Sequence, residues 1–374
     1  MQSNTSKDKI FYIDNLRVLM TVLVVLHHTL ITYGAPGGWY FTDPTHNQPA
    51  LIVMTLMVAT NQAFFMGFFF LLSALFTEPS YQKKGPAKFM LDRLKRLGLP
   101  LLFYNFILGP CMNFLIYRYG RHQQATFMQY LAGYDNWIDP GVMWFVLALL
   151  VFTFIYFLFK RFSSKSEYGK YNLPGDKQIF LFAFLLGIAS YLVRIIFPIG
   201  WVLKPLGFQL AHFPQYISMY IWGIIASRND WMNTINQQTG RKWMYVALLF
   251  VLVIFPTIFI LNKSPLETFM GKGTWQSLMV ALWEQITGVS IMVALSGIGQ
   301  TKWNFTTGLL QQMSRASFAT YIFHPLVIIA ITLLLLPVNI EPVIKLIIAA
   351  PCGILLSFCL GWIITKIPLV KEIV

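Results

Sequence analysis

Residues 10–33, "IFYIDNLRVLMTVLVVLHHTLITY", decide the fold. The stretch is mostly apolar and exceeds the roughly 20 residues that a helix needs to cross the hydrocarbon core of a membrane. Its apolar residues run on, whereas those of a barrel strand would alternate with polar ones. Because lipid offers the backbone no hydrogen-bond partners, the stretch is predicted to be a membrane-spanning helix. This helix carries Arg17 near one end and His27 and His28 near the other.

Nine further apolar segments of similar length follow along the chain. They lie near residues 51–76, 99–117, 142–160, 178–198, 209–227, 243–261, 275–298, 317–336 and 343–365. Only 11% of the 374 residues are charged, whereas soluble proteins carry about 25%. We therefore expect an all-α polytopic membrane protein, a bundle of about ten transmembrane helices. A single integral-membrane domain over residues 1–374 is expected, with no appended soluble domain.

The net charge of +14 is distributed unevenly across the predicted membrane. When the loops are assigned to alternating sides, 21 of the 28 Lys and Arg residues fall on one side and six on the other, with Lys345 inside the last span. This positive-inside pattern predicts a multi-pass protein of the plasma (inner) membrane with both termini in the cytoplasm. It accounts for the basic excess without nucleic acid. The basic loops 77–98 and 160–177 would also attract an anionic ligand or lipid headgroups.

The three cysteines indicate neither a metal site nor a disulfide framework. Cys111, Cys352 and Cys359 lie in or beside apolar spans, and none has metal-ligand spacing to a histidine. No metal cofactor is therefore expected. The N-terminus resembles a signal peptide in charge, but its apolar stretch is too long and lacks a clear cleavage site, so it is expected to remain as the first helix.

Two polar residues of the first span share one face of the helix. Arg17 and His28 are eleven residues apart, which brings them within about 20° of three full turns and separates them by about 16 Å along the axis. His27 points about 100° away. Because ionisable residues inside membranes usually face the bundle interior, the pair indicates a functional site. The alternatives are that Arg17 reaches the headgroups and that His28 only packs.

Two later predicted spans carry polar residues within otherwise apolar sequence. Glu284 lies well inside an apolar run, where a carboxylate needs a partner or a proton. It is predicted to pair with His28, since a base oriented by a carboxylate is a recurrent arrangement. In "SRASFATYIFHPLV", Ser317, Tyr321 and His324 share a face, and Pro325 frees the carbonyl of residue 321.

The remaining candidates each have a structural alternative. Ser73 could be a small packing residue, and Arg93, Lys95 and Arg96 could set topology or bind phosphate. Trp144 could anchor the outer interface, Arg194 could reach the headgroups from near the outer end of its span, and His212 could be an ordinary loop residue. Aromatic residues of the outer loops could anchor the interface or stack on sugar rings: Trp39, Tyr40, Trp137 and Trp201.

Taken in order, these residues resemble the acyltransferase-3 family of membrane O-acyltransferases, in particular its glucan-modifying branch. The resemblance covers essentially the whole chain. It is carried by "IDNLR" with Arg17 and His28, by Phe70 and Ser73, by Arg93 and Arg96 leading into "GLP", by "MWFVLALLVF", and by Ser317, Tyr321, His324 and Pro325. The chain departs from the family pattern at Ala74, where a glycine is usual.

The resemblance implies an enzyme that moves an acyl group, acetyl or succinyl, from cytoplasmic acyl-CoA to a hydroxyl of an extracytoplasmic glycan or glycolipid. Membrane lipids would be its other partners. It implies His28 as the catalytic histidine and Arg17, Arg93 and Arg96 toward the CoA end. Our expected site adds Glu284, Tyr321 and His324 to the catalytic group, Ser73 to the donor side, and Trp144, Arg194 and His212 as substrate contacts.

Other functions and details stay open at this point. His28 could act as a general base or accept the acyl group itself. A proton-coupled transporter would also place Arg, His and Glu inside a bundle, although neither an inverted repeat nor paired broken helices are visible in the sequence. A third hypothesis is a protein that only binds lipids or partners. The acyl chain, the acceptor and the oligomeric state are not determined by the sequence.

Overall fold

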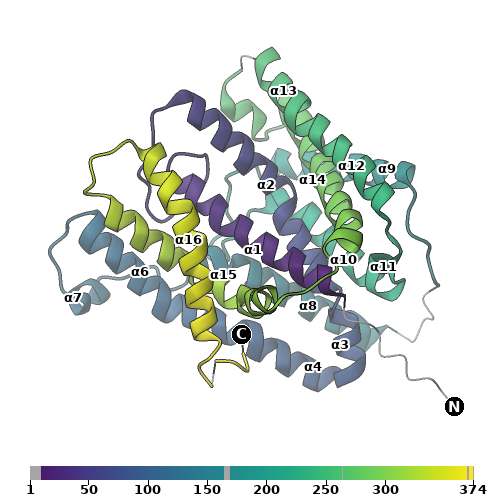
Figure 1. Cartoon of the computed structure of the whole chain (residues 1–374), viewed down its shortest axis with the longest axis horizontal. Coiled ribbons are helices and arrows are strands. Elements are labelled where there is room, and N and C mark those ends of the chain that lie inside the picture. The colour runs from purple at the N-terminus through teal and green to yellow at the C-terminus, as the bar shows by residue number, and fades with distance from the viewer. Residues whose placement is uncertain (1–9, 164–168, 263, 369, 374) are drawn as a thin grey trace.

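The computed structural model describes residues 10–163, 169–262, 264–368 and 370–373, and their regular structure is helical (Figure 1). The helices are α1 Phe11–Thr32, α2 Gln48–Ala74, α3 Thr77–Lys84, α4 Pro86–Arg93, α5 Leu99–Phe103, α6 Gly109–Leu115, α7 Phe127–Ala132, α8 Trp144–Phe162, α9 Asp176–Ile196, α10 Phe213–Arg228, α11 Trp231–Thr234, α12 Gln237–Leu249, α13 Phe255–Leu261, α14 Trp275–Lys302, α15 Gly308–Leu335 and α16 Pro342–Ile364. Short 3₁₀ turns cover Gly141–Met143, Leu210–His212 and Leu266–Phe269.

Nine helical segments of the described residues are long and apolar enough to cross a membrane. They correspond to nine of the ten predicted spans, which confirms an all-α polytopic membrane protein. The remaining predicted span, 209–227, is α10, whose 16 residues are short for a crossing. It packs against α2 and α9. Helix α15 begins at Gly308, earlier than the predicted 317.

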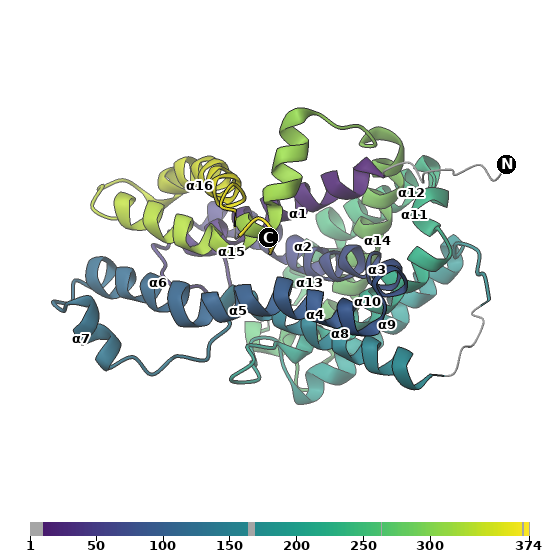
Figure 2. The ribbon, with the colours of Figure 1, turned by 90° about the horizontal axis from the view of Figure 1, so that it is seen from below.

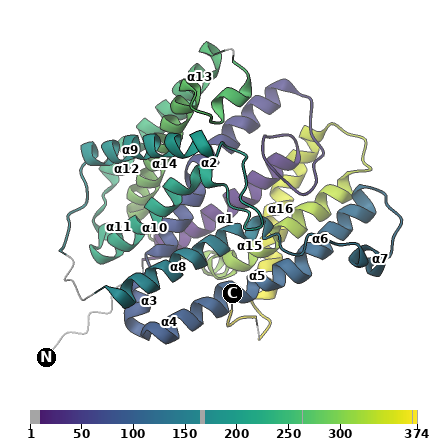
Figure 3. The same ribbon diagram turned by 180° about the vertical axis from the view of Figure 1, so that it is seen from behind.

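Helix α1 lies in the middle of the molecule, where α2, α15 and α16 pack against it (Figure 1). Seen from below, α4, α5 and α6 follow one another as a long rod under the bundle, with α7 at its far end (Figure 2). Seen from behind, α8 crosses this face, and α9 and α10 lie above it (Figure 3). The two histidines of α1 are therefore held in the interior.

Glycine allows α2 and α14 to approach closely. A Cβ atom at Gly288 of α14 would overlap the carbonyl oxygen of Ala63 in α2 and would lie 2.9 Å from the amide nitrogen of Gln215. Small residues at helix contacts give this kind of close packing in membranes. The approach lets Gln215 of α10 donate to both the Ala63 carbonyl at 2.7 Å and Gln285 at 2.8 Å, so three helices share one buried polar contact.

The rod from Pro86 to Gly120 is continuous but changes pitch. π-Helical turns cover Leu94–Gly98 and Tyr104–Leu108, and each is followed within two residues by a proline, Pro100 or Pro110. A proline lacks the N–H that would continue the helix and its ring crowds the preceding turn, so a widened turn relieves the conflict. The second of these turns begins at Tyr104, whose side chain belongs to the site described next.

Candidate active site

Two histidines from distant helices meet in the bundle. His28 of α1 and His324 of α15 are 296 residues apart in sequence, yet His28 Nδ1 lies 2.9 Å from His324 Nε2. The two rings are nearly parallel, at 10°, and the indole of Trp39 stacks on His28 with 4.2 Å between ring centroids. His324 is fully buried, whereas His28 is half-buried. The structure thus joins two of the predicted catalytic residues.

The proline of α15 explains how His324 is held. His324 Nδ1 lies 2.7 Å from the carbonyl oxygen of Tyr321, one turn back along the helix. In a regular helix this carbonyl would accept from the N–H of residue 325, which in Pro325 does not exist. The predicted freeing of the Tyr321 carbonyl is confirmed, because that carbonyl contacts the imidazole.

The neighbouring histidine and serine do not join this contact. The ring of His27 packs on Phe65 of α2, and its Nδ1 is buried without a hydrogen-bond partner among the described residues. His27 therefore lies on the α2 side of the helix, although its ring still meets the His28 ring edge-on, with 5.5 Å between ring centroids. Ser317 donates to the carbonyl of Met313 in its own helix at 2.8 Å, so its hydroxyl is satisfied locally.

A group of tyrosine hydroxyls gathers at Val142, and one of these tyrosines, Tyr321, has its ring 5.9 Å from that of His324. The hydroxyl of Tyr321 donates to the Val142 carbonyl, and the hydroxyls of Tyr40 and Tyr104 bond to each other. The N–H of Val142 donates to the Tyr40 oxygen at 3.3 Å. Burial raises the pKa of Tyr40 to about 12, so its hydroxyl stays neutral at physiological pH. Because the proton of Tyr321 already has an acceptor, this residue ties α15 to the turn before α8.

Trp39 carries a polar group that has no partner. Its indole Nε1 is buried and has no acceptor among the described residues, although the ring lies against His28. A buried donor without a partner costs about 1–3 kcal/mol, so its presence calls for an explanation. The sequence placed Trp39 in an outer loop but could not show that it lies beside His28.

The predicted pairing of Glu284 with His28 is wrong. Glu284 bonds to Arg194, whose Nη2 lies 2.8 Å from both carboxylate oxygens, and to His212 Nδ1 at 3.1 Å. The reason is the direction of the helices: α14 turns Glu284 toward α9 and α10, while α1 turns His28 toward α15.

Arg194 does not reach the membrane surface. It is 0% exposed, its Nε donates to the Ala211 carbonyl at 3.3 Å, and its Nη1 is buried without a partner in the described ranges. His212 is also buried. Their predicted role as substrate contacts remains a prediction, and in this conformation Arg194 offers no surface to a ligand. The snorkelling alternative is excluded by this burial.

Trp144, the third predicted substrate contact, is half-buried and stacks on Tyr216, with 5.5 Å between ring centroids. Tyr216 in turn lies near the ring of His212, at 6.2 Å. Trp144, the first residue of α8, is therefore linked through Tyr216 to His212 of the Arg194–Glu284–His212 cluster. Its position is more central than that of an interface anchor.

On the predicted cytoplasmic side, Arg17 and Arg93 come together. Arg17 lies over the ring of Phe76, 4.4 Å from its centroid, and 3.5 Å from Asp14. It is close enough to Arg93 for the two positive charges to act on each other. The Nε atom of Arg93 is buried with no partner among the described residues. Two cations with a free buried donor form a site suited to an anion.

The other predicted donor-side residues lie differently. Arg96 is exposed and bonds Asp92 at 3.2 Å, and Lys95 is exposed beside Glu372 at 3.3 Å. Ser73 is half-buried near the end of α2. Arg93 lies over the ring of Phe89, 5.3 Å from its centroid, whereas Arg96 pairs with the carboxylate of Asp92.

One buried charge cluster was missed in the sequence. Glu78 of α3 is 4% exposed and bonds Lys160 of α8 at 3.0 Å and Arg228 of α10. It joins the ends of three helices on the predicted cytoplasmic side. The available signal was a carboxylate at the start of the loop 77–98, which carries six basic residues and only one other acidic residue, Asp92.

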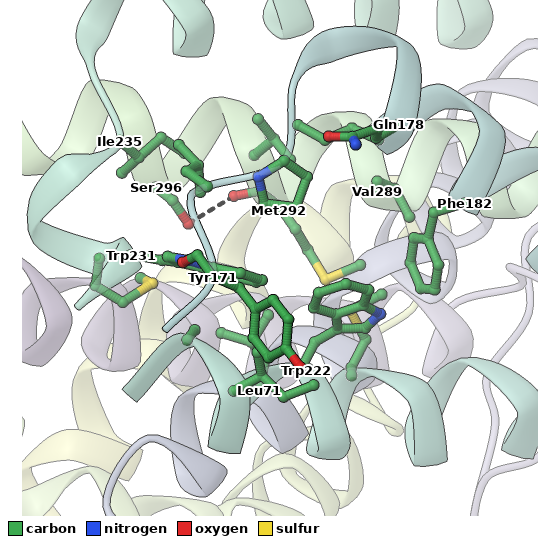
Figure 4. Close-up of a pocket in the computed structure, with 18 of the residues that line it drawn as sticks. Leu71, Tyr171, Gln178, Phe182, Trp222, Trp231, Ile235, Val289, Met292 and Ser296 are labelled. Atoms are coloured by element: carbon green, nitrogen blue, oxygen red, sulfur yellow. Dashed lines mark hydrogen bonds between the residues drawn. The ribbon is translucent and has the colours of Figure 1, made fainter. Parts of the chain in front are cut away.

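A cavity of about 620 Å³ lies elsewhere, between α9, α10, α11 and α14 (Figure 4). Figure 4 shows Phe182, Trp222 and Met292 around it, and the hydroxyl of Ser296 is bonded to the Met292 carbonyl at 2.8 Å. No predicted site residue lines it. Its mostly apolar walls fit a hydrocarbon better than a phosphate or a sugar, so we do not assign the acyl-transfer site to it.

The residues that the structure describes contain no group of three or more His, Cys, Asp or Glu side chains arranged to hold a metal ion. The side chains that meet at the histidine pair are the two imidazoles, the ring of Tyr321 and the indole of Trp39.

Comparisons with known proteins agree with this architecture. The family model described as "Acyltransferase domain" matches residues 10–366. Glucans biosynthesis protein C of Escherichia coli O17:K52:H18 (strain UMN026 / ExPEC) is 22% identical over 329 residues, covering 84% of this chain and 80% of that protein. Its counterpart from Salmonella heidelberg (strain SL476) is 21% identical over 331 residues, covering 84% and 81%. No solved structure matches significantly. The chain belongs to the acyltransferase-3 family and is a multi-pass acyltransferase of the inner membrane.

Proposed function

We propose that the protein transfers an acetyl or succinyl group from cytoplasmic acyl-CoA to a hydroxyl of an extracytoplasmic glycan. The family membership supports acyl transfer, and the name of the curated relatives supports a glucan-type acceptor. The observation that carries the proposal is the His28–His324 contact, because it supplies an oriented imidazole inside a bundle with basic residues below and aromatic residues beside it.

The donor side is assigned to Arg17 and Arg93. The phosphates of CoA would bind these two cations and the unpartnered Nε of Arg93. The pantetheine arm would then run along α1, on which Arg17 and His28 are about 16 Å apart. Such a layout lets the charged part of the donor stay at the cytoplasmic face while the thioester enters the bundle.

The reaction needs one base at His28. Its ring nitrogen takes the proton of the acceptor hydroxyl, and the oxygen attacks the thioester carbonyl. The tetrahedral intermediate then breaks the carbon–sulfur bond, and the departing thiolate takes the proton back from the imidazolium. An ester and free CoA thiol result, and His28 returns to its starting state.

The developing oxyanion needs a hydrogen-bond donor. Tyr321 donates to Val142 already, whereas the Trp39 N–H has no acceptor among the described residues and lies on a ring stacked on His28. We assign this donor role to Trp39. Its indole and the Tyr40 ring, 4.9 Å apart, also provide an aromatic surface for a sugar.

The test is thiol release by the purified, lipid-reconstituted protein supplied with acetyl-CoA or succinyl-CoA and candidate glucans. The wild type should release CoA thiol and acylate the glucan. His28→Ala should lose both activities, by a factor of about 10² to 10⁴. His27→Phe is the matched control, since it changes the adjacent histidine on the Phe65 side.

Full turnover in His28→Ala would contradict the proposal. So would movement of a solute across the vesicle membrane without consumption of CoA esters, which would instead support a transporter built on the buried Arg194, His212 and Glu284.

A further inference from the structure

The Tyr321 carbonyl determines which nitrogen of His324 carries a proton. A carbonyl oxygen only accepts hydrogen bonds, and it lies 2.7 Å from His324 Nδ1. His324 Nδ1 must therefore be protonated. His324 is fully buried, and no carboxylate contacts its ring within the described part of the chain. An unpaired imidazolium there would be strongly disfavoured, so His324 is neutral and its Nε2 is a hydrogen-bond acceptor.

The protonated nitrogen of His28 follows from that of His324. Since His324 Nε2 accepts, the 2.9 Å contact requires that His28 Nδ1 donates. A neutral His28 then has its lone pair on Nε2. We propose that His324 is a positioning residue that fixes His28 in the Nδ1–H tautomer and so makes Nε2 the nitrogen that takes the proton. This inference rests on the proposed function of His28 and deepens it.

The surroundings of His28 fit this assignment. Trp39 stacks on the ring and limits its rotation, while Nε2 has no hydrogen-bond partner in the described ranges. His28 is half-buried, whereas His27 and His324 are buried. Among these three histidines, His28 alone combines partial exposure with a ring nitrogen held by a partner.

The arrangement makes proton transfer at His28 a local event. When Nε2 takes the hydroxyl proton, the imidazolium still donates Nδ1–H to His324 Nε2, and His324 keeps its own proton on Nδ1. No proton moves from His28 to His324, and the leaving thiolate removes the proton from His28 Nε2. A neutral partner orients the base as a carboxylate would, without placing a negative charge in the interior.

Pro325 is the second residue that determines the tautomer of His28, because it leaves the Tyr321 carbonyl free for His324 Nδ1. Pro325→Ala restores an N–H that competes with His324 Nδ1 for the Tyr321 carbonyl. We expect this variant to weaken the hydrogen bond from His324 Nδ1 to the Tyr321 carbonyl. The two tautomers of His28 should then be mixed, although His28, His324 and Trp39 are all still present.

The test is nitrogen NMR of the full-length protein with ¹⁵N-labelled histidine, in nanodiscs and without substrate. Wild-type His28 should show protonated Nδ1 and unprotonated Nε2. His324→Leu should lose this preference, and its kcat should fall roughly 10²-fold while the KM for acyl-CoA is unchanged. His324→Gln keeps an amide oxygen that can accept from His28, so it should recover most of the tautomer preference and of kcat.

Phe323→Leu, one residue away, is the control for packing in α15. A wild-type His28 protonated on Nε2 would overturn the inference, as would a His324→Leu variant that loses activity but keeps the Nδ1–H tautomer. The NMR readout needs no turnover, so it stands even if His28→Ala proves active and the proposed function fails.

Discussion

At the residue scale, what an ionisable side chain does depends on its nearest partner. His28 and Glu284 were both predicted from sequence as polar residues in apolar helices, but they belong to different clusters. His28 has a neutral partner and is only partly buried, which suits a group that gains and loses a proton. Glu284 has a guanidinium and an imidazole beside it and is buried, which suits a fixed charge.

Removing the Glu284 charge should therefore affect stability. Glu284→Gln leaves Arg194 buried without a counter-charge, and breaking such a pair costs about 3–5 kcal/mol. Thermal unfolding in detergent should show a clear loss, and the double variant Arg194→Met/Glu284→Leu should be more stable than Glu284→Gln. Wild-type stability combined with a shifted pH–rate profile would instead return Glu284 to the acid–base group.

The two arginines of the inner loop should differ. Arg93→Ala removes a cation whose charge acts on Arg17 and whose buried Nε has no partner among the described residues, so acyl-CoA binding should weaken about tenfold and lose part of its salt dependence. Arg96→Ala removes an exposed residue that already pairs with Asp92, so its effect should be smaller. Calorimetric titration at two salt concentrations measures both, and equal affinities in all three proteins would reduce both arginines to topology-setting charges.

The proposed role of Trp39 as a hydrogen-bond donor can be tested by removing only its indole N–H. Trp39→Phe keeps an aromatic ring against His28 but removes the indole N–H. If that N–H stabilises the oxyanion, kcat should fall by about 10² or more while the KM values stay similar. A rise in the glycan KM with unchanged kcat would show that Trp39 serves the sugar instead.

At the scale of elements, the packing of α2, α10 and α14 depends on a close approach at Gly288. Gly288→Ala adds a Cβ that overlaps the Ala63 carbonyl, so the contact of α14 with α2 must loosen. We expect a loss of about 1–3 kcal/mol in stability, measured by thermal unfolding. Gly98→Ala is the control, because a Cβ there meets nothing within 4 Å. Equal melting temperatures for the two variants would contradict the close packing.

At the scale of the whole molecule, the charge distribution predicts the orientation. In a variant with its three cysteines replaced by serine, Asn136→Cys should react with a membrane-impermeant maleimide on intact cells. Gln82→Cys, in the basic loop, should react only after permeabilisation. The reverse pattern would invert the topology and would place Arg17 and Arg93 away from cytoplasmic CoA.

The sequence by itself determined the helical bundle, most of its spans and the shortlist of polar residues. Hydropathy and helical periodicity are local properties, so the shared face of Arg17 and His28 and the carbonyl freed by Pro325 could be predicted without a fold. Only the tertiary structure decided the partners: His28 with His324, Glu284 with Arg194 and His212. Partners are set by which helix faces meet, and that depends on close contacts such as Gly288 on Ala63, between residues far apart in the chain.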